Sequence, residues 1–385
     1  MSDAFSMERP LGRSKGDGAL LGALVLAAGL GLAHLYSASY GYALALGRGA
    51  SYFALRQALW LLPAAAAFMV IAMVPLSFWR SLAGPVVLLS IALLVLPFIP
   101  GLGIVKNGAS RWFGFGSLSF QPSELFKPAL VLYLAHILAK KEERLNDIMR
   151  GVLPPLLLIG LGIAIVLFQN DFSTAIILAG IALCMFWIAK VPLIFFAAAS
   201  SVGLPLLALT VLTSDYRLKR VVGFLAPRFD PADLSYQVNG SIKAIRAGGL
   251  WGRGIGQGSL KLRSIPLVLS DFIFSAWAEE TGFIGVLVFI LLWAFILYRA
   301  IRASFGAADS YRSYLAFGMA FYLGLQTLIN ILVAVGAVPA TGMPLPLFSS
   351  GGSALLSVVI ASGFIYAVSR EQRADARHEG RTSND

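Results

Sequence analysis

Charged residues, histidine and cysteine are all scarce in this sequence of 385 residues. Aspartate, glutamate, lysine and arginine make up 13% of the chain, about half of their share in ordinary globular proteins. The single cysteine, Cys184, excludes an intrachain disulfide, and its place in an apolar run indicates a small packing residue. The three histidines are far apart and show no ligand-like spacing, so we predict that they form no metal site.

Apolar residues dominate instead. They make up 58% of the chain, and the mean hydropathy is +0.80, which a soluble domain of this length could not hide from water. Many apolar runs reach the length of about 20 residues that a helix needs to cross a bilayer. Because lipid offers the backbone no hydrogen-bond partners and continuous apolar runs favour helices, we predict an all-α polytopic membrane protein with about ten transmembrane helices. The expected spans are residues 19–38, 57–76, 82–99, 123–139, 151–169, 172–189, 191–213, 271–298, 313–336 and 352–369.

Lysine and arginine are distributed unevenly among the connections between these spans. If the N-terminus is cytoplasmic, sixteen of them lie in inside segments and four lie in the short outside loops. By the positive-inside rule, this bias predicts a protein of the cytoplasmic (inner) membrane with both termini cytoplasmic. We expect an N-terminal tail (residues 1–18), one transmembrane domain (19–369) and a C-terminal tail (370–385). The net charge of +11 then indicates contact with anionic membrane lipid and not with nucleic acid.

Two charged residues in the fourth span need an explanation, because ionisable groups are costly inside a membrane. Glu124 and Lys127 are three residues apart and therefore share one face of a helix. They could form an internal ion pair that allows both to be buried, or they could contact a substrate directly. The sequence leaves these two interpretations equal.

Four further carboxylates lie inside spans or at their edges. Asp171 is predicted to cap the helix that follows it, and Asp271 could likewise be the N-cap of the eighth span. Capping and catalysis are compatible roles, since a helix N-terminus stabilises a carboxylate. Glu279 and Glu280 point to different sides of one helix, so at least one of them should face the protein interior.

The longest polar segment, residues 214–270, is predicted to be an extracytoplasmic loop between the seventh and eighth spans. It contains nine lysines and arginines against three aspartates, and its stretch Gly248–Gly258 is rich in glycine. Glycine lets a backbone approach a ligand closely, and basic side chains beside exposed amides suit a phosphate. The alternative is a loop that lies on anionic lipid headgroups, and composition does not separate the two.

The last outside loop, residues 337–351, has no charge but is dense in proline, glycine and serine. Non-helical backbone at membrane depth is tolerated where it lines a cavity in the protein. We therefore expect this loop to dip into the protein and to form one wall of a polar cleft. The alternative is an ordinary exposed turn.

Several motifs occur in an order and spacing that chance would not produce. They extend from Ser37–Ser39 and Arg56–Gln57 to Gly351–Ser353, and so cover nearly the whole chain. Together they resemble the SEDS family, the shape, elongation, division and sporulation proteins typified by RodA and FtsW. The strongest matches are Asn107–Trp112, Phe120–Lys127, Asp230–Pro231 with Tyr236–Gln237, Gly248–Gly252, Ser270–Phe274 with Ala278–Gly282, and Gln326 and Asn330 with Thr341–Pro346.

This resemblance implies peptidoglycan glycosyltransfer, the polymerisation of lipid II at the outer face of the membrane. Lipid II is a disaccharide-pentapeptide on undecaprenyl pyrophosphate, and the family's essential aspartate falls on Asp271. Leu267 and Leu269 stand where the family usually has a glutamate and a histidine, which puts the polar partners of this aspartate in doubt. The short run before the aspartate and Tyr236–Gln237 favour an FtsW-like division type, whereas Thr341 favours a RodA-like elongation type.

From this resemblance we predict that Asp271 is the general base, because a carboxylate within reach can remove the proton of an attacking sugar hydroxyl. The leaving pyrophosphate gains charge, which basic side chains or a divalent cation such as Mg²⁺, the one candidate cofactor, would stabilise. The residues that we expect to bind substrate are Arg56, Arg111, Gln121, Ser123, Glu124, Lys127, Arg217, Lys219, Arg220, Tyr236, Gln237, Ser241, Gly249, Ser270, Glu279, Gln326, Asn330, Ser349 and Gly351.

Three alternatives stay open at this point. A lipid II flippase or transporter would use the same charged spans but would need alternating access and no base. A non-catalytic scaffold would recruit a cell-wall transpeptidase, and an elongation-type polymerase would share the chemistry but serve the side wall. The implied partners are a class B penicillin-binding protein and other membrane proteins of the divisome or elongasome.

Overall fold

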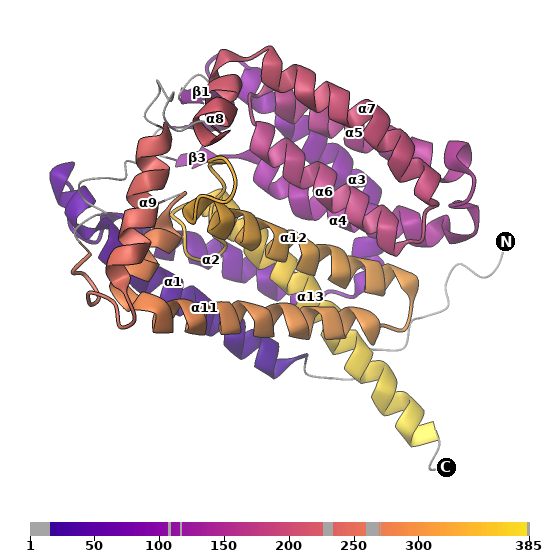
Figure 1. Ribbon diagram of the computed structural model, residues 1–385. Helices are drawn as coiled ribbons and strands as arrows, with labels where there is room; N and C mark the ends of the chain where they lie inside the picture. Colours follow the sequence, from indigo (N-terminus) through magenta and orange to yellow (C-terminus); the bar gives the residue numbers. More distant parts are fainter. Residues whose placement is uncertain are drawn as a thin grey trace.

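The computed structural model describes residues 16–106, 109–115, 118–225, 234–258, 269 and 271–382. Within these ranges, ten helices correspond to the ten predicted spans and lie side by side along roughly one direction (Figure 1). The predicted all-α polytopic architecture is therefore confirmed. The ten helices are α1 (Gly18–Ala45), α2 (Tyr52–Met73), α3 (Leu76–Val95), α4 (Pro122–Lys140), α5 (Leu153–Phe168), α6 (Phe172–Ile188), α7 (Leu193–Leu212), α11 (Ile273–Phe305), α12 (Ser310–Ala334) and α13 (Gly352–Thr382).

Eight of the described helices are long and apolar enough to cross a membrane by length and composition. The other two are α6, an apolar helix of 17 residues, and α4, whose hydropathy is lowered by Glu124 and Lys127. Six helices extend by three or more residues beyond the predicted spans. α2, α3 and α12 begin early, at Tyr52, Leu76 and Ser310, and α1 and α11 run on to Ala45 and Phe305. α13 continues to Thr382, where a tail was expected from residue 370. Hydropathy detects only the apolar part of a helix, so the more polar turns at these ends were missed.

α4 is the central helix of the bundle. It packs against α3, α6, α12 and α13, and most of its residues from Pro122 to Leu138 are buried. α7 lies at the periphery, where Phe195 is its one buried residue. Lipid tails are as apolar as leucine or valine, so the outer helices can expose apolar side chains to lipid at little cost. The interior of the bundle can therefore hold polar groups.

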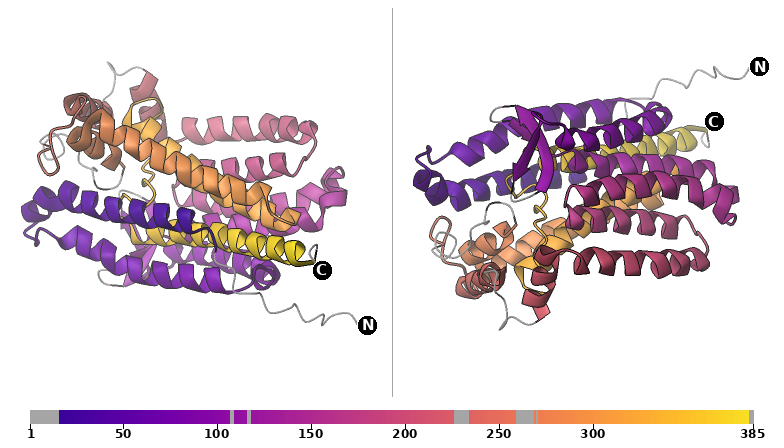
Figure 2. Two further views of the ribbon diagram at one scale, coloured as in Figure 1. Left: turned by 90° about the horizontal axis from the view of Figure 1, so that it is seen from below. Right: turned by 90° about the horizontal axis from the view of Figure 1, so that it is seen from above.

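One end of the bundle carries a small sheet and two extra helices. The sheet is antiparallel, with the order β1-β2-β3, and consists of Gly103–Lys106, Ala109–Phe115 and Leu118–Phe120. The two helices, α8 (Asp215–Leu225) and α9 (Leu234–Gly248), fall within the predicted loop 214–270 and lie at the same end (Figure 1). The start of α1 and the end of α13 lie at the opposite end (Figure 2).

The segment between α12 and α13 enters the protein instead of crossing its surface. Met343, Leu345 and Phe348 are at most 4% exposed and belong to the main hydrophobic core. A close backbone contact holds the segment against α1, since a Cβ added to Gly31 would lie 2.3 Å from the carbonyl oxygen of Leu347. The prediction that this segment dips inward is confirmed.

Candidate active site

Asp271 lies where the long connection from α7 meets α11. The helix begins at Ile273, and its N-cap is Phe272, whose side chain makes no capping hydrogen bond. The prediction that Asp271 is the N-cap is therefore wrong, because the backbone becomes helical two residues later than the hydropathy indicated. Asp271 is partly exposed, and its carboxylate lies beside the segment between α12 and α13, where a Cβ added to Gly342 would be 3.6 Å from its Oδ2.

Hydrogen bonds fix the main chain on both sides of this carboxylate. The Asn330 side-chain amide donates to the Asp271 carbonyl at 3.0 Å and to the Met343 carbonyl at 2.7 Å. The Ser350 backbone amide donates to the Leu269 carbonyl at 2.8 Å. The backbone of the candidate base is thus tied to α12 and to the inward segment, and the residue is partly exposed.

The predicted cations of α8 point to two different places. The Arg220 guanidinium donates to the Ala340 carbonyl at 3.0 Å, in the segment between α12 and α13. Arg217 donates to the Asn170 side chain at 3.2 Å, on the turn before α6, and Lys219 is exposed. Arg220 is therefore the cation of α8 that a described contact links to the segment beside the candidate base.

Asp171 caps α6, as predicted. It accepts hydrogen bonds from the Thr174 amide at 3.4 Å and from the Thr174 hydroxyl at 2.9 Å. The same carboxylate accepts from the Gln121 side chain at 3.0 Å and pairs with the Arg111 guanidinium at 3.4 Å. Gln121 also donates to the Ser123 hydroxyl at 3.1 Å. Three of the predicted substrate-binding residues are thus gathered around a helix cap.

Glu124 and Lys127 form the buried ion pair that was one interpretation of their spacing. Lys127 Nζ donates to Glu124 Oε1 at 2.8 Å and to Gln326 Oε1 at 2.9 Å, and the lysine is 0% exposed. Gln326 in turn donates to the Pro344 carbonyl at 2.9 Å. This chain of contacts supports the segment beside the candidate base from within the bundle.

Both carboxylates of the Glu279 and Glu280 pair are buried, so the prediction that at least one faces the interior is confirmed. The Glu280 carboxylate accepts a hydrogen bond from the Ser37 hydroxyl at 2.8 Å and lies 3.4 Å from His34 Nδ1, both on α1. Glu279 pairs with Arg253 at 3.6 Å. These contacts join α1 and the glycine-rich stretch to α11.

The glycine-rich stretch packs its backbone directly against α11. A Cβ added to Gly248 would lie 2.1 Å from the Ala278 carbonyl oxygen. One added to Gly252, which has a φ of +80°, would lie 2.2 Å from the Glu280 carbonyl oxygen. Gly249 has a φ of +54° and open space around its Cβ position. Helix packing therefore accounts for glycine at 248 and 252, where the composition had suggested backbone free to approach a phosphate.

Replacing Gly248 by alanine is expected to lower the thermal midpoint of the protein in detergent, because the added methyl group would overlap the Ala278 carbonyl. Overpacking of this kind costs about 1–3 kcal/mol. Gly29→Ala is the control, since Gly29 is an exposed residue of α1 with nothing within 4 Å of an added Cβ, and alanine favours a helix. Differential scanning fluorimetry checks both variants, and equal midpoints would contradict the close packing.

Gln57 is a residue near the site that the sequence-based prediction missed. Its side chain donates to the Ser349 carbonyl at 3.2 Å and accepts from the Gly351 amide at 3.2 Å. It follows Arg56, which is partly exposed in α2, and both belong to one of the motifs that carry the family resemblance. That motif was the signal that could have identified it.

Four predicted residues lie on α9 or directly after it, namely Tyr236, Gln237, Ser241 and Gly249. Ser241 is buried and donates to the Ala334 carbonyl at 2.6 Å, which ties α9 to α12. Gln237 is partly exposed on the same helix. Among the residues that the structure describes, no group of three or more histidines, cysteines, aspartates or glutamates is placed to hold a metal ion. Among the positions named from the sequence, those outside the described residues are Asn107, Asp230, Pro231, Leu267, Ser270 and the side chain of Tyr236.

The chain matches a known family and its curated relatives over nearly its whole length. The sequence model of the FtsW/RodA/SpoVE family, described as "Cell cycle protein", matches residues 18–374. A relative from Geobacter sp. (strain M18), named "Probable peptidoglycan glycosyltransferase FtsW", is 36% identical. The alignment covers 90% of this chain and 94% of that relative. "Stage V sporulation protein E" of Bacillus subtilis (strain 168) is also 36% identical, and the alignment covers 89% of this chain and 94% of that relative.

Solved structures with the same fold match most of the chain. The rod shape determining protein RodA of Thermus thermophilus has a TM-score of 0.68 and 27% identity, covering 93% of this chain and 97% of that one. A second match is a chain from the structure titled "Structural coordination of polymerization and crosslinking by a peptidoglycan synthase complex". It has a TM-score of 0.74 and 27% identity, and the match covers 93% of this chain and 98% of that one. The likeness in fold therefore extends over most of this chain.

Proposed function

We propose, on the premise that this chain belongs to the FtsW/RodA/SpoVE family of cell cycle proteins, that Asp271 is the general base of its glycosyl transfer. The chain is a multi-pass membrane protein and a peptidoglycan glycosyltransferase, the activity for which its curated FtsW relatives are named. The proposed substrate is lipid II. The observation that carries the proposal is a partly exposed aspartate on a main chain that Asn330 and Ser350 hold on both sides.

In the proposed reaction, a sugar hydroxyl attacks an anomeric carbon whose bond to pyrophosphate breaks. The Asp271 carboxylate accepts the hydroxyl proton as the new bond forms, and a positioned base of this kind typically contributes about 10²–10⁴ in rate. An α-linked donor and a β-linked product require inversion in a single displacement, which needs a base but no covalent enzyme intermediate. The pyrophosphate leaves with the electron pair of the broken bond.

Charge that develops on the pyrophosphate needs fixed positive groups nearby. Arg220 is the leading candidate, because its guanidinium holds the segment beside Asp271. Arg217 and Arg111 lie around the turn before α6 and would contact a more distant part of the substrate. Lys127 is fully buried and acts as a positioning residue. A divalent cation such as Mg²⁺, bound together with the pyrophosphate, would add positive charge there.

The end of the bundle with Asp271 lies outside the cytoplasm in this proposal, and both termini lie inside, as the bias in lysine and arginine supports. The proposed partner is a crosslinking enzyme, a class B penicillin-binding protein, because a chain of similar fold occurs in a peptidoglycan synthase complex that coordinates polymerization and crosslinking. The proposed setting is cell division within the divisome, which the relatives named FtsW support.

Purified full-length protein is expected to form glycan polymer from lipid II in detergent, either alone or with a class B penicillin-binding protein. Detergent solution has no second compartment, so polymer formation separates a polymerase from a flippase and from a scaffold. A parallel reaction with EDTA, followed by added Mg²⁺, tests the divalent cation. No polymer in the presence of both partner and Mg²⁺ would contradict the proposed activity.

A further inference from the structure

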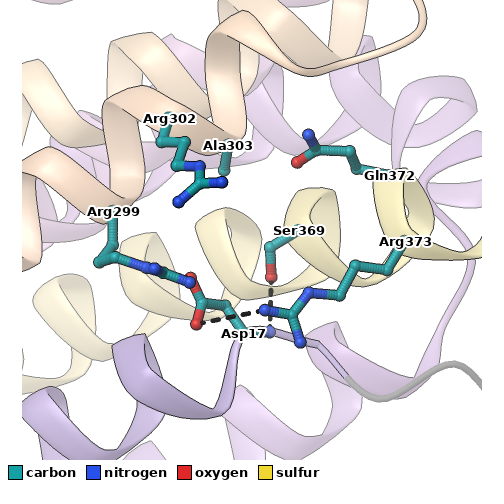
Figure 3. Close-up of a pocket in the computed structure, with 7 residues that line it drawn as sticks. All are labelled: Asp17, Arg299, Arg302, Ala303, Ser369, Gln372 and Arg373. Carbon is teal, nitrogen blue, oxygen red and sulfur yellow. Dashed lines mark hydrogen bonds and ion pairs between the residues drawn. The ribbon is translucent and has the colours of Figure 1, made fainter. Parts of the chain in front are cut away.

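Four charged side chains line a pocket at the end of the bundle opposite Asp271. The pocket has a volume of about 380 Å³ and lies between α1, α11 and α13 (Figure 3). Arg299 and Arg302 come from the last turns of α11, Arg373 comes from α13, and Asp17 precedes α1. Three guanidinium groups thus surround one carboxylate, which leaves an excess of positive charge. The volume falls within the range of small-ligand sites.

Asp17 is already occupied by its own neighbours. Its Oδ1 accepts from the Ala19 and Leu20 amides at 3.1 and 3.2 Å and so caps α1. Its Oδ2 accepts from Arg299 Nε at 2.6 Å, and Arg373 lies 3.7 Å from Oδ1. Asp17 therefore orients two of the arginines around the pocket, but one carboxylate cannot neutralise three guanidinium groups.

Arg302 supplies the uncompensated charge. Its side chain makes no hydrogen bond or ion pair with any residue that the structure describes, and Figure 3 shows its guanidinium over the pocket, with Gln372 on the far side. Guanidinium groups bind phosphate oxygens through two parallel hydrogen bonds, and they are more weakly hydrated than an ammonium group. The lining therefore suits an anion with several oxygens.

The surface around this pocket indicates where such an anion would come from. Tyr298 and Phe305 flank the two arginines of α11 and are 58% and 77% exposed. Exposed aromatic side chains at the end of a membrane helix mark the level of the lipid headgroups. A ligand at this position would meet the arginines with its phosphate and the exposed apolar side chains with its acyl chains.

We propose that this pocket binds the phosphate of an anionic phospholipid headgroup, of the phosphatidylglycerol class. In the proposed orientation the lipid belongs to the cytoplasmic leaflet, where anionic lipids attract basic groups. The three helices that line the pocket are far apart in sequence, so a bound lipid would join the start of α1 to the ends of α11 and α13. The site lies apart from the catalytic end, and its occupancy does not depend on the proposed glycosyl transfer.

Native mass spectrometry of the full-length protein, titrated with phosphatidylglycerol in detergent, tests this site. Arg302→Gln is expected to weaken lipid retention about tenfold, the loss typical of one charge-assisted hydrogen-bond partner. Arg150→Gln is the matched control, because Arg150 is an arginine at the same end that is 82% exposed and lies outside the pocket. This control should retain the lipid as the unchanged protein does.

Two further titrations separate a lipid site from other anion sites. Phosphatidylcholine has the same phosphate but no net charge, and it should bind at least tenfold more weakly. Inorganic phosphate at millimolar concentration should fail to displace phosphatidylglycerol, because it lacks the acyl chains. Displacement by inorganic phosphate would overturn the lipid assignment, and equal lipid retention by Arg302→Gln and the unchanged protein would overturn the site itself.

Discussion

Asp271→Asn is expected to lower the rate of lipid II polymerisation at least a hundredfold while the protein keeps its fold. Asparagine has nearly the shape of aspartate but cannot accept a proton, and general-base catalysis typically contributes about 10²–10⁴. The hydrogen bonds from Asn330 and Ser350 go to main-chain carbonyl groups, so the substitution leaves them in place. The loss should therefore fall on kcat and leave lipid II binding nearly unchanged.

The control for this experiment is Asp215→Asn. Asp215 is an exposed aspartate at the start of α8, at the same end of the bundle, and its replacement removes the same charge from the same side of the membrane. Initial rates of glycan formation and lipid II binding should be measured for both variants, with a thermal midpoint to confirm folding. A near-normal polymerisation rate for Asp271→Asn would refute the assignment of the base.

The membrane helices could be predicted because each one is a continuous apolar run, which is a local property of the chain. The small sheet and the two helices of the long connection could not. The strands of the sheet are only three to seven residues long. α8 and α9 are amphipathic and much less apolar on average than the membrane helices, so a search for apolar runs treats them as loop. Their stability depends on packing against the bundle, which no single segment records.

The candidate site divides in the same way between local and long-range information. The pairing of Glu124 with Lys127 followed from a spacing of three residues on one helix. The partner that joins this pair to the site, Gln326, lies 199 residues away from Lys127, and no periodicity connects them. Asp271 itself was identified by resemblance to a family. The contact of Asn330 with its carbonyl required the tertiary fold.

Lys127→Met is expected to destabilise the protein by about 3–5 kcal/mol, the usual cost of removing one partner of a buried ion pair. Methionine nearly fills the volume of lysine, so the loss comes from Glu124, whose side chain stays buried at 3% exposure without its cation. Lys140→Met is the control on the same helix, because Lys140 is exposed in the last turn of α4. Thermal or denaturant unfolding in detergent should show the loss in the first variant alone.

The double variant Glu124→Gln with Lys127→Met separates stability from positioning. Removing both charges avoids the uncompensated carboxylate, so most of the lost stability should return, since neutral replacements of buried ion pairs are often tolerated. Polymerisation should stay below the normal rate, because Gln326 loses the donor that helps it hold the Pro344 carbonyl beside the site. The expectation would be contradicted by a double variant that is less stable than Lys127→Met. The two side chains would then stabilise the bundle through contacts other than the pairing of their charges. A double variant with full activity would exclude Lys127 as a positioning residue.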